Sequence, residues 1–255
     1  MRAIVAIPCY NCAPQLPRVL DGVDERLLTR VEEFWVVDNR SSDDTAEVAL
    51  RYKESGRIPS LRVFRNDRNV NLGGTHKIVF SAAAEAGFTH VVILHGDDQA
   101  STAEVHDLLD VAADPARPDT VLGSRFDRRS RLHGYDRKRI AGNRVLNALY
   151  SVVAGRRLQD LGSGLNVFAV RDLDPRTYRT FADALTFNFE LILDLVRRRV
   201  RFQFLPITWR ETDQVSNARN VQVFTGALKI LTRWRLHRRR PVDPAAPYTW
   251  TELGE

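Results

Sequence analysis

The sequence predicts an α/β protein with a mostly parallel central sheet flanked by helices. Short apolar runs bounded by turn residues are typical of buried strands, and four of them lie at 3–7, 34–37, 61–64 and 91–94. Helical patterns separate these runs, so the chain alternates strand and helix as right-handed βαβ units do. With 255 residues, 44% of them hydrophobic, the chain is long enough to bury such a core.

The first two strands are each followed by polar loop residues. The first strand is expected to end at Pro8, after which Tyr10 and Asn11 open a loop. Apolar residues then recur at helical spacing from Leu16 to Leu28, and the second strand ends at Asp38. In parallel sheets, ligands bind beyond the carboxyl ends of the strands, so these loops are candidates for a site.

Helices are expected after the second and third strands and again past the middle of the chain. An Asp- and Ser-rich stretch at 41–45 is a good N-terminal cap for a helix over 46–55. Residues 69–74 are expected to form a turn before a helix over 75–86, and a further helix starts near Ile140.

The polar residues after the fourth strand form the centre of the predicted site. Gly96, Asp97, Asp98 and Gln99 follow the buried run closely. Carboxylates at a strand end are hard ligands that suit Mg²⁺ or Mn²⁺, and Mg²⁺ is usually held by one or two of them together with substrate phosphates. A polar turn after a core strand is the alternative, since Asp and Gly are frequent in turns.

The charge balance indicates an anionic partner. The chain carries 38 Lys and Arg against 32 Asp and Glu, and all but four of the basic residues are Arg, which suits bidentate phosphate contacts. Phosphates, a lipid surface and nucleic acid are the candidate classes. Because no recognised nucleic-acid-reading module is present, we expect no nucleic acid partner.

Several protein classes are disfavoured by motifs that the sequence lacks. No G-x-G-x-x-G follows the first strand and no G-x-x-x-x-G-K-[ST] occurs, which argues against a dinucleotide fold and a P-loop NTPase. No apolar run reaches the roughly 18–20 residues of a membrane span, and the first residues lack a signal-peptide pattern. We therefore expect a cytoplasmic protein.

Cys9 and Cys12 have the C-x-x-C spacing of redox pairs and of half zinc sites. No second cysteine pair exists to complete a zinc site. We interpret Cys9 as a small buried thiol at the strand end and Cys12 as a loop residue.

Six motifs stand in one order along the chain, at Ile7–Asn11, Val36–Thr45, Asn69 with Gly73–Gly74, His95–Gln99, Gly123–Arg125 and Asp160–Gly164. Together they resemble glycosyltransferase family 2, and most closely its polyprenyl-phosphate, dolichol-phosphate mannose synthase-like subgroup. The resemblance covers about residues 1–216 and implies a GT-A type nucleotide-diphospho-sugar transferase fold, a Rossmann-like α/β sheet. Residues 217–255 are predicted to be a basic amphipathic helix and a Pro-rich tail.

The resemblance implies a donor site and a divalent metal, Mg²⁺ or Mn²⁺. Asp97 matches the second Asp of the family's D-x-D metal motif and Gln99 the following Gln, so Asp97, His95 and Gln99 are the candidate metal ligands. Asp38 would accept hydrogen bonds from the nucleotide base, with Ser41 holding its loop. The candidate donor-binding residues are Pro8, Tyr10, Asn11, Asp38, Ser41, Asn69, Gly73, Lys77, Asp97, Gln99 and Arg125.

A cluster of basic residues between 125 and 144 is either an active-site lid that meets phosphates or a solvated loop. Arg125 is the first candidate, because the resemblance places it near phosphates. Asp97, Arg125 and Asp160 are the candidate catalytic residues. The candidate acceptor-binding residues are Arg139, Arg144, Ser163 and Gly164.

Four positions depart from the family pattern. His95 stands at the first D-x-D position, and imidazole is a softer ligand than Mg²⁺ prefers. Asn71 stands where the family has Gly, and Cys12 where many members carry Glu. Of the usual Arg…Gly-x-Ser pattern near the end of the matched region, Ser216 remains.

The resemblance implies metal-assisted transfer of a sugar from a UDP-, GDP- or dTDP-linked donor to a polyprenyl phosphate, with inversion favoured. A lipid phosphate needs no strong general base, because its second pKa lies near about 6. A soluble hydroxyl acceptor is the alternative, and it would need a base, for which Asp160 is the candidate with Glu190 behind it. Structural roles for both remain open, Asp160 as a cap or brace and Glu190 on a packed helix.

The C-terminal region is predicted to contain a helix over 221–236. Its apolar stripe ends in Trp234, and Arg238, Arg239 and Arg240 follow. A basic amphipathic helix with Trp indicates peripheral contact with a membrane surface, and the inner leaflet is the candidate surface. The alternative is a helix packed on the domain with a solvated basic end.

Overall fold

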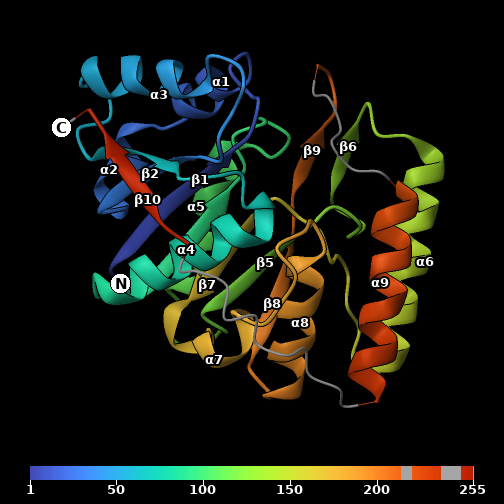
Figure 1. Ribbon diagram of the computed structural model, residues 1–255. Helices are drawn as coiled ribbons and strands as arrows, with labels where there is room; N and C mark the ends of the chain where they lie inside the picture. Colours follow the sequence, from blue (N-terminus) through green and yellow to red (C-terminus); the bar gives the residue numbers. More distant parts are fainter. Residues whose placement is uncertain (214–219, 237–247, 255) are drawn as a thin grey trace.

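The computed structural model describes residues 1–213, 220–236 and 248–254. Within these residues, one large sheet has eight strands (Figure 1), which are β1 (Ala3–Cys9), β2 (Glu33–Asp38), β3 (Leu61–Asn66), β4 (His90–Leu94), β5 (Thr120–Ser124), β7 (Leu165–Ala169), β8 (Phe202–Pro206) and β10 (Trp250–Leu253). Their order is β10-β3-β2-β1-β4-β7-β5-β8. Strands β3, β2, β1 and β4 are parallel, β8 is parallel to β5, and β7 and β10 are antiparallel to their neighbours. A small second sheet pairs β6 (Arg131–His133) with β9 (Thr208–Arg210).

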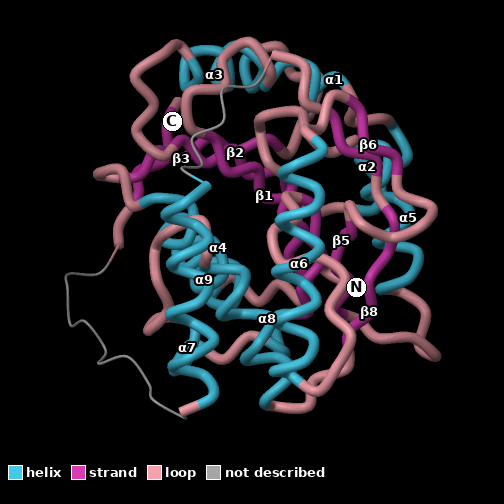
Figure 2. The backbone as a smooth tube through the Cα atoms, turned by 90° about the vertical axis from the view of Figure 1, so that its right-hand side faces the viewer, coloured by secondary structure: helices cyan, strands magenta, loops and turns pink. Residues whose placement is uncertain are grey.

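Helices cover both faces of the large sheet. One face carries α1 (Leu16–Asp21), α2 (Glu25–Arg30), α3 (Thr45–Glu54) and α5 (Val105–Ala112). The other carries α4 (Asn71–Glu85), α6 (Arg137–Ala154), α7 (Pro175–Tyr178), α8 (Phe187–Arg197) and α9 (Asn220–Arg235). Short 3₁₀ helices span Thr102–Glu104 and Val170–Asp172. Figure 2 looks onto the second group, in which α6 and α8 both contact α9.

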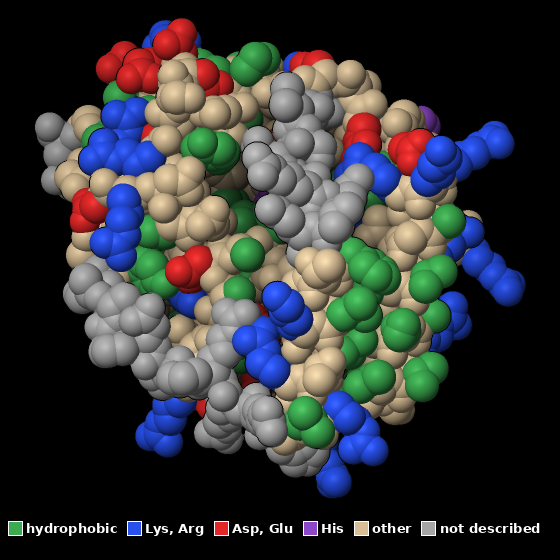
Figure 3. All heavy atoms as spheres, turned by 45° about the vertical axis from the view of Figure 1, so that its right-hand side comes forward, with side chains coloured by type: hydrophobic (Ala, Val, Ile, Leu, Met, Phe, Trp, Pro, Cys, Tyr) green, Lys and Arg blue, Asp and Glu red, His purple; other side chains and the backbone are tan. Residues whose placement is uncertain are grey.

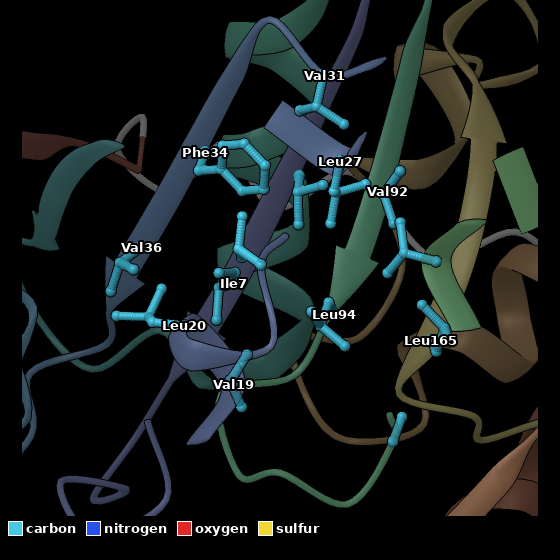
Figure 4. Packing of buried hydrophobic residues seen from close by; sticks show 14 of the residues in the cluster. Ile7, Val19, Leu20, Leu27, Val31, Phe34, Val36, Val92, Leu94 and Leu165 are labelled. Atoms are coloured by element: carbon cyan, nitrogen blue, oxygen red, sulfur yellow. The ribbon is translucent and has the colours of Figure 1, made fainter. Parts of the chain in front are cut away.

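The core follows the alternation of side chains along each strand. In β1, Ile7 packs with the α1 and α2 side, and Ile4 packs with the opposite side. Figure 4 shows residues of the first of these clusters, among them Ile7, Leu20 and Phe34. All seven residues of β1 are buried, as expected of a strand that is covered on both faces.

The helical pattern from Leu16 to Leu28 forms two helices instead of one. Gly22 lies against Thr102, where a Cβ atom would come within 2.7 Å of the Thr102 Cβ. The second helix starts after Asp24, whose carboxylate accepts a hydrogen bond from the Leu27 amide at 2.8 Å. Close packing and an N-cap therefore interrupt a pattern that its apolar residues alone would continue.

Two predicted boundaries differ from the structure. The first strand continues through Pro8 to Cys9 instead of ending at Pro8. The turn predicted at 69–74 was also wrong, because α4 already begins at Asn71. Gly73 lies inside its first turn, where a Cβ would come within 2.5 Å of the Ala182 carbonyl oxygen. The glycine therefore allows close packing against a distant segment.

The C-terminal residues pack against the rest of the molecule. Trp250 of β10 stacks on Phe64 of β3, with ring centroids 4.1 Å apart. In α9, Ala227 and Leu231 are buried, whereas Phe224 and Leu228 are exposed, so the predicted stripe divides between core and surface. The division of the chain at residue 216 stays a prediction. Four predicted residues lie outside the described residues, namely Ser216, Arg238, Arg239 and Arg240.

Candidate active site

Two neighbouring cavities lie beyond the carboxyl ends of β1 and β4. The larger encloses about 870 Å³ and the smaller about 500 Å³. His95 and Asp97, which follow β4, line both of them. The other shared lining residues are Tyr10, Cys12, Leu72, Leu185 and Val223. The site therefore forms beyond the carboxyl ends of the strands, as the sequence predicts.

Asp97 is a partly enclosed carboxylate between the two cavities. Burial, with a smaller contribution from the charge of Asp98, raises the pKa of Asp97 to about 6. Its Oδ1 accepts a hydrogen bond from the Gln99 amide at 3.3 Å. Asp98 has φ of 56° and pairs with Arg18, whose Nε lies 2.6 Å from its Oδ2. Asp98 therefore points away from the site and lines neither cavity.

His95 is held in one place by its neighbours. Its backbone amide donates to the Gly164 carbonyl at 3.1 Å, and a Cβ at Gly164 would lie 2.8 Å from the His95 Nδ1. Its Nε2 is buried and has no hydrogen-bond partner. Burial, and then the charge of Arg125, lower the pKa of His95 to about 4, so the ring is neutral at pH 7. Glycine at 164 is thus required for the ring to pack there.

Arg125 and Asp160 form a buried ion pair. The Arg125 Nε and backbone amide both donate to Asp160 Oδ2 at 2.8 Å, and Nη2 donates to Oδ1 at 2.8 Å. Asp160 Oδ1 also accepts from the Gly162 amide at 3.0 Å. Arg125 lies over the Trp209 ring, 4.9 Å from its centroid, and lines the larger cavity, whereas Asp160 does not. The Asp160 carboxylate acts as a brace for Arg125.

The predicted acceptor residues lie in different surroundings. Arg139 lines the larger cavity and pairs with Glu211 at 2.6 Å. Arg144 lies on the same helix, but its side chain is exposed and lines neither cavity. Ser163 is buried, and its Oγ forms hydrogen bonds with the Leu165 backbone. Gly164 packs against the His95 ring. Glu190 lines neither cavity and accepts from the Ala182 amide at 2.7 Å, consistent with a structural role.

The predicted donor residues divide into lining and supporting groups. Tyr10 lines both cavities, Asn11 and Gln99 the larger one, and Pro8 and Asn69 the smaller one. The remaining three side chains and one glycine line neither cavity, namely Asp38, Ser41, Lys77 and Gly73.

Each supporting side chain has a clear partner. Asp38 is fully buried, pairs with Arg65 at 2.7 Å and accepts from the Ser41 amide. Ser41 Oγ accepts from the Asn11 amide at 2.9 Å. Lys77 Nζ donates to Asp183 at 2.7 Å. These contacts hold the loops around the site, and the predicted contact of Asp38 with a base stays a prediction.

Several lining residues were missed by reasoning from the sequence. Lys138 stands in the basic cluster but was not among the candidate residues, although it lines the larger cavity with Arg139. The others supply an apolar or aromatic wall, and they are Tyr135, Leu146, Leu185, Phe189, Trp209, Val223 and Phe224. The apolar stripe of α9 was the available signal for Phe224. Nothing in the local sequence indicated that α6, α8 and α9 would enclose one space.

Both cysteines are buried and unpaired by a disulfide. Cys12 lies in the loop after β1, as predicted, and it is buried there, because its sulfur and that of Cys9 pack against Gly96. A hydrogen bond with Cys12, and then burial, raise the pKa of Cys9. A raised pKa is typical of an unreactive thiol.

The residues present fit a divalent cation that accepts both carboxylate oxygen and imidazole nitrogen as ligands. No group of three or more His, Cys, Asp and Glu side chains capable of holding a metal occurs in the part of the chain that the structure describes. Asp97 and His95 both border the two cavities, and the His95 Nε2 has no hydrogen-bond partner. Such a pair leaves positions for phosphate oxygens, as is usual where a cation is shared with a substrate.

Comparison with known proteins places this site in context. A model of the family "Glycosyl transferase family 2" matches residues 4–172. The chain is 21% identical over 235 residues to a dolichyl-phosphate β-glucosyltransferase of Saccharomyces cerevisiae, covering 82% of this chain and 67% of the relative. It is 26% identical over 166 residues to an undecaprenyl-phosphate 4-deoxy-4-formamido-L-arabinose transferase of Photorhabdus laumondii, covering 64% of this chain and 48% of the relative. The chain thus spans about two thirds of one relative and about half of the other.

Solved structures with the same fold include two sugar transferases. Glucosyl-3-phosphoglycerate synthase of Mycobacterium tuberculosis, solved with Mn²⁺, UDP and phosphoglyceric acid, has a TM-score of 0.65 at 15% identity, covering 98% of this chain and 86% of that one. A mannosyltransferase of Pyrobaculum calidifontis, solved with GDP-mannose and Mn²⁺, has a TM-score of 0.56 at 19% identity, covering 89% and 64%. At these identities the likeness concerns the fold. Separately, no helix in the described ranges is both long and apolar enough to span a membrane.

Proposed function

The chain belongs to glycosyl transferase family 2, and from this premise we propose that it moves a sugar from a nucleotide-diphosphate donor to the phosphate of a polyprenyl-type lipid. The predicted GT-A fold and the predicted enzyme class, a glycosyltransferase, are confirmed by the family match and by the solved structures. The identity of the acceptor is the part that we propose.

The observation that carries the proposal is the lining of the larger cavity. Arg125, Lys138 and Arg139 bring cationic side chains to it, and Arg side chains bind phosphate oxygens well. Apolar side chains, among them Phe189 and Phe224, also line this cavity. A cavity that combines cations with an apolar wall suits a ligand with a phosphate head and a hydrocarbon tail.

The state of Asp160 supports a phosphate acceptor over a hydroxyl one. A hydroxyl acceptor needs a general base within hydrogen-bond reach, and Asp160 was the candidate. Its carboxylate already accepts four hydrogen bonds, three from Arg125 and one from Gly162. A lipid phosphate is anionic at neutral pH and can attack without such a base. Asp160 is therefore assigned the role of holding Arg125 beside the acceptor phosphate.

We assign the donor to the smaller cavity and to the boundary that both cavities share. The smaller cavity is lined by polar side chains such as Asn39 and Asn69 and by the Tyr10 ring, which suit a nucleoside. Its diphosphate would lie at the boundary, beside His95 and Asp97. The anomeric carbon would then face the larger cavity, where the acceptor phosphate attacks as the bond to the diphosphate breaks.

Asp97 and His95 are the residues that would hold a divalent cation at this boundary. When bound, the cation would stabilise the negative charge that develops on the departing diphosphate. Arg125 lines the larger cavity, and its positive charge would also stabilise the negative charge of the departing diphosphate.

The surface beside the larger cavity suits contact with a bilayer. On α6, Val145, Leu149 and Val152 are 59%, 37% and 82% exposed, and their spacing places them on one side of the helix. Figure 3 shows hydrophobic side chains gathered on the side of α6 and α9, with Lys and Arg side chains around them. Exposed apolar groups next to cations favour an anionic membrane surface. The acceptors named for the two relatives, dolichyl and undecaprenyl phosphate, support this assignment.

The test is transfer from UDP-, GDP- and dTDP-linked sugars, with Mn²⁺, to polyprenyl phosphate in anionic vesicles. We expect a glycosylated lipid phosphate, and we expect that Val152→Glu lowers the vesicle rate while a short-chain soluble phosphate is used as before. The competing acceptor is a soluble hydroxyl compound, since a similar fold binds phosphoglyceric acid. Glycosylation of phosphoglyceric acid in preference to the lipid phosphate would replace our proposal with that alternative.

A further inference from the structure

The boundary between the cavities offers one carboxylate where an aspartate pair would offer two. Asp97 lines both cavities, but Asp98 is turned toward Arg18, whose Nε lies 2.6 Å from its Oδ2. The backbone of Asp98 is in the left-handed region, with φ of 56°. Bringing this carboxylate into the site would require breaking the ion pair and changing that backbone conformation. Asp98 therefore does not supply the second oxygen ligand.

His95 occupies the place of that second ligand. It leaves β4 two residues before Asp97 and lines both cavities. Its ring is fixed between the Gly164 backbone and the His76 ring, whose centroid is 6.2 Å away. Its buried Nε2 has no hydrogen-bond partner. A buried polar atom without a partner is costly, so an unpartnered imidazole beside a carboxylate points to a bound ion.

We infer that His95 makes this site selective for a transition-metal dication, Mn²⁺, over Mg²⁺; the inference rests on the proposed donor site. Mg²⁺ strongly prefers oxygen ligands and near-ideal octahedral geometry. First-row transition metals accept imidazole nitrogen as well as carboxylate oxygen. Replacing one carboxylate by an imidazole also removes one negative charge, which weakens the attraction for a hard cation more than for one that gains a nitrogen ligand.

The test measures metal binding directly, without an acceptor and without turnover. Mn²⁺ is titrated into the metal-free full chain with UDP, and in parallel with GDP, while electron paramagnetic resonance follows the free Mn²⁺ signal. Mg²⁺ is then added as a competitor. His95→Asp restores a carboxylate pair, and we expect it to lower the Mg²⁺ excess needed to displace half of the Mn²⁺ by about tenfold or more, in the range that changes around a metal site produce.

Two further variants keep the test decisive. His95→Ala, which only removes the ring, should weaken Mn²⁺ binding by a similar factor. His90→Asn is the matched control, because His90 lies at the other end of β4, also has a buried Nε2 without a hydrogen bond and lines neither cavity; it should behave as the wild type. Melting temperatures without metal show whether each variant is folded.

The inference is overturned if the wild type and His95→Asp give the same displacement curve, if His95→Ala binds Mn²⁺ as tightly as the wild type, or if the wild type binds no Mn²⁺ with either nucleotide. Because no acceptor is present, a failure of the lipid-phosphate proposal would leave these results unchanged. The two failures can therefore be told apart.

Discussion

The strand-end loops around Asp97 and the helical wall formed by α6, α8 and α9 are built in different ways. The strand-end loops are held by short polar contacts, such as Ser41 Oγ with the Asn11 amide at 2.9 Å and Arg65 with Asp38 at 2.7 Å. The helical wall brings apolar side chains from all three helices to the larger cavity, and one of them, Phe224, remains exposed. The first region is suited to fix a charged donor, and the second to receive an apolar acceptor.

The largest effect is expected from Asp97, which belongs to the strand-end loops and borders both cavities. Asp97→Ala should lower kcat/KM by about 10²–10³-fold, the scale of losing one preorganised electrostatic group, and should abolish metal-dependent donor binding. The fold should survive, because Asp97 lies in the loop after β4 and borders the cavities. Steady-state kinetics and a melting curve check both points. Turnover equal to that of the wild type would remove Asp97 from the site.

The next effect is expected from the buried ion pair of Arg125 and Asp160, which the two variants below test through stability. Asp160→Asn should cost about 3–5 kcal/mol of unfolding free energy, because it leaves the buried charge of Arg125 without its partner. Arg125→Met together with Asp160→Leu should cost less than the single change. Urea denaturation measures both. If Asp160 is instead a general base, Asp160→Asn will remove the acidic limb of the pH–rate profile and leave stability unchanged.

Two arginines on one helix provide a matched comparison within the helical wall. Arg139 lines the larger cavity and Arg144 does not. Arg139→Ala should raise the KM for the acceptor phosphate by about tenfold or more, since a hydrogen bond to a charged group contributes about 1.5–3 kcal/mol. Arg144→Ala should leave this KM unchanged with a soluble acceptor. Equal effects of the two variants would mean that the cavity does not mark the phosphate site.

The smallest effect near neutral pH concerns His76, a buried residue of α4. Burial, and then the charge of His95, lower the pKa of His76 to about 3, from 6.5 in the unfolded chain. Below pH 6.5 the unfolded state takes up a proton that the folded state does not, so stability falls as pH falls from 6.5 toward 3, by up to about 1.4 kcal/mol per pH unit. His76→Asn should have a shallower loss over this window in urea titrations at several pH values. Parallel curves for the two proteins would contradict the assignment.

The two regions also differ in how far the sequence predicts them. The strands and the position of Asp97 follow from local patterns, because a short apolar run and the polar residues after it are contiguous. Gly73 was wrongly predicted to lie in a turn. A glycine is needed there because the Ala182 carbonyl oxygen packs against it, and Ala182 lies far along the chain. Arg125 and Asp160 were both candidates, but their pairing depends on how β5 and the 160–164 loop meet in space.

The helical wall was largely unpredicted for the same reason. Phe189, Leu146 and Phe224 lie on three helices, and each looks like an ordinary core residue in its own segment. Only the packing of α6 and α8 with α9 brings them to one cavity. The basic cluster could not be sorted either, because Lys138, Arg139 and Arg144 are all basic and are distinguished only by their orientation on one helix.

The central claim is that the cations and the apolar wall of the larger cavity serve one acceptor, a lipid phosphate. The most direct test compares kcat/KM for three acceptors with the same donor: a polyprenyl phosphate, the polyprenol of the same chain length, and a short water-soluble alkyl phosphate. We predict that the polyprenyl phosphate is the best acceptor, that the short phosphate is used less efficiently, and that the polyprenol is not glycosylated. Efficient glycosylation of the polyprenol, or equal use of the long and short phosphates, would contradict the claim.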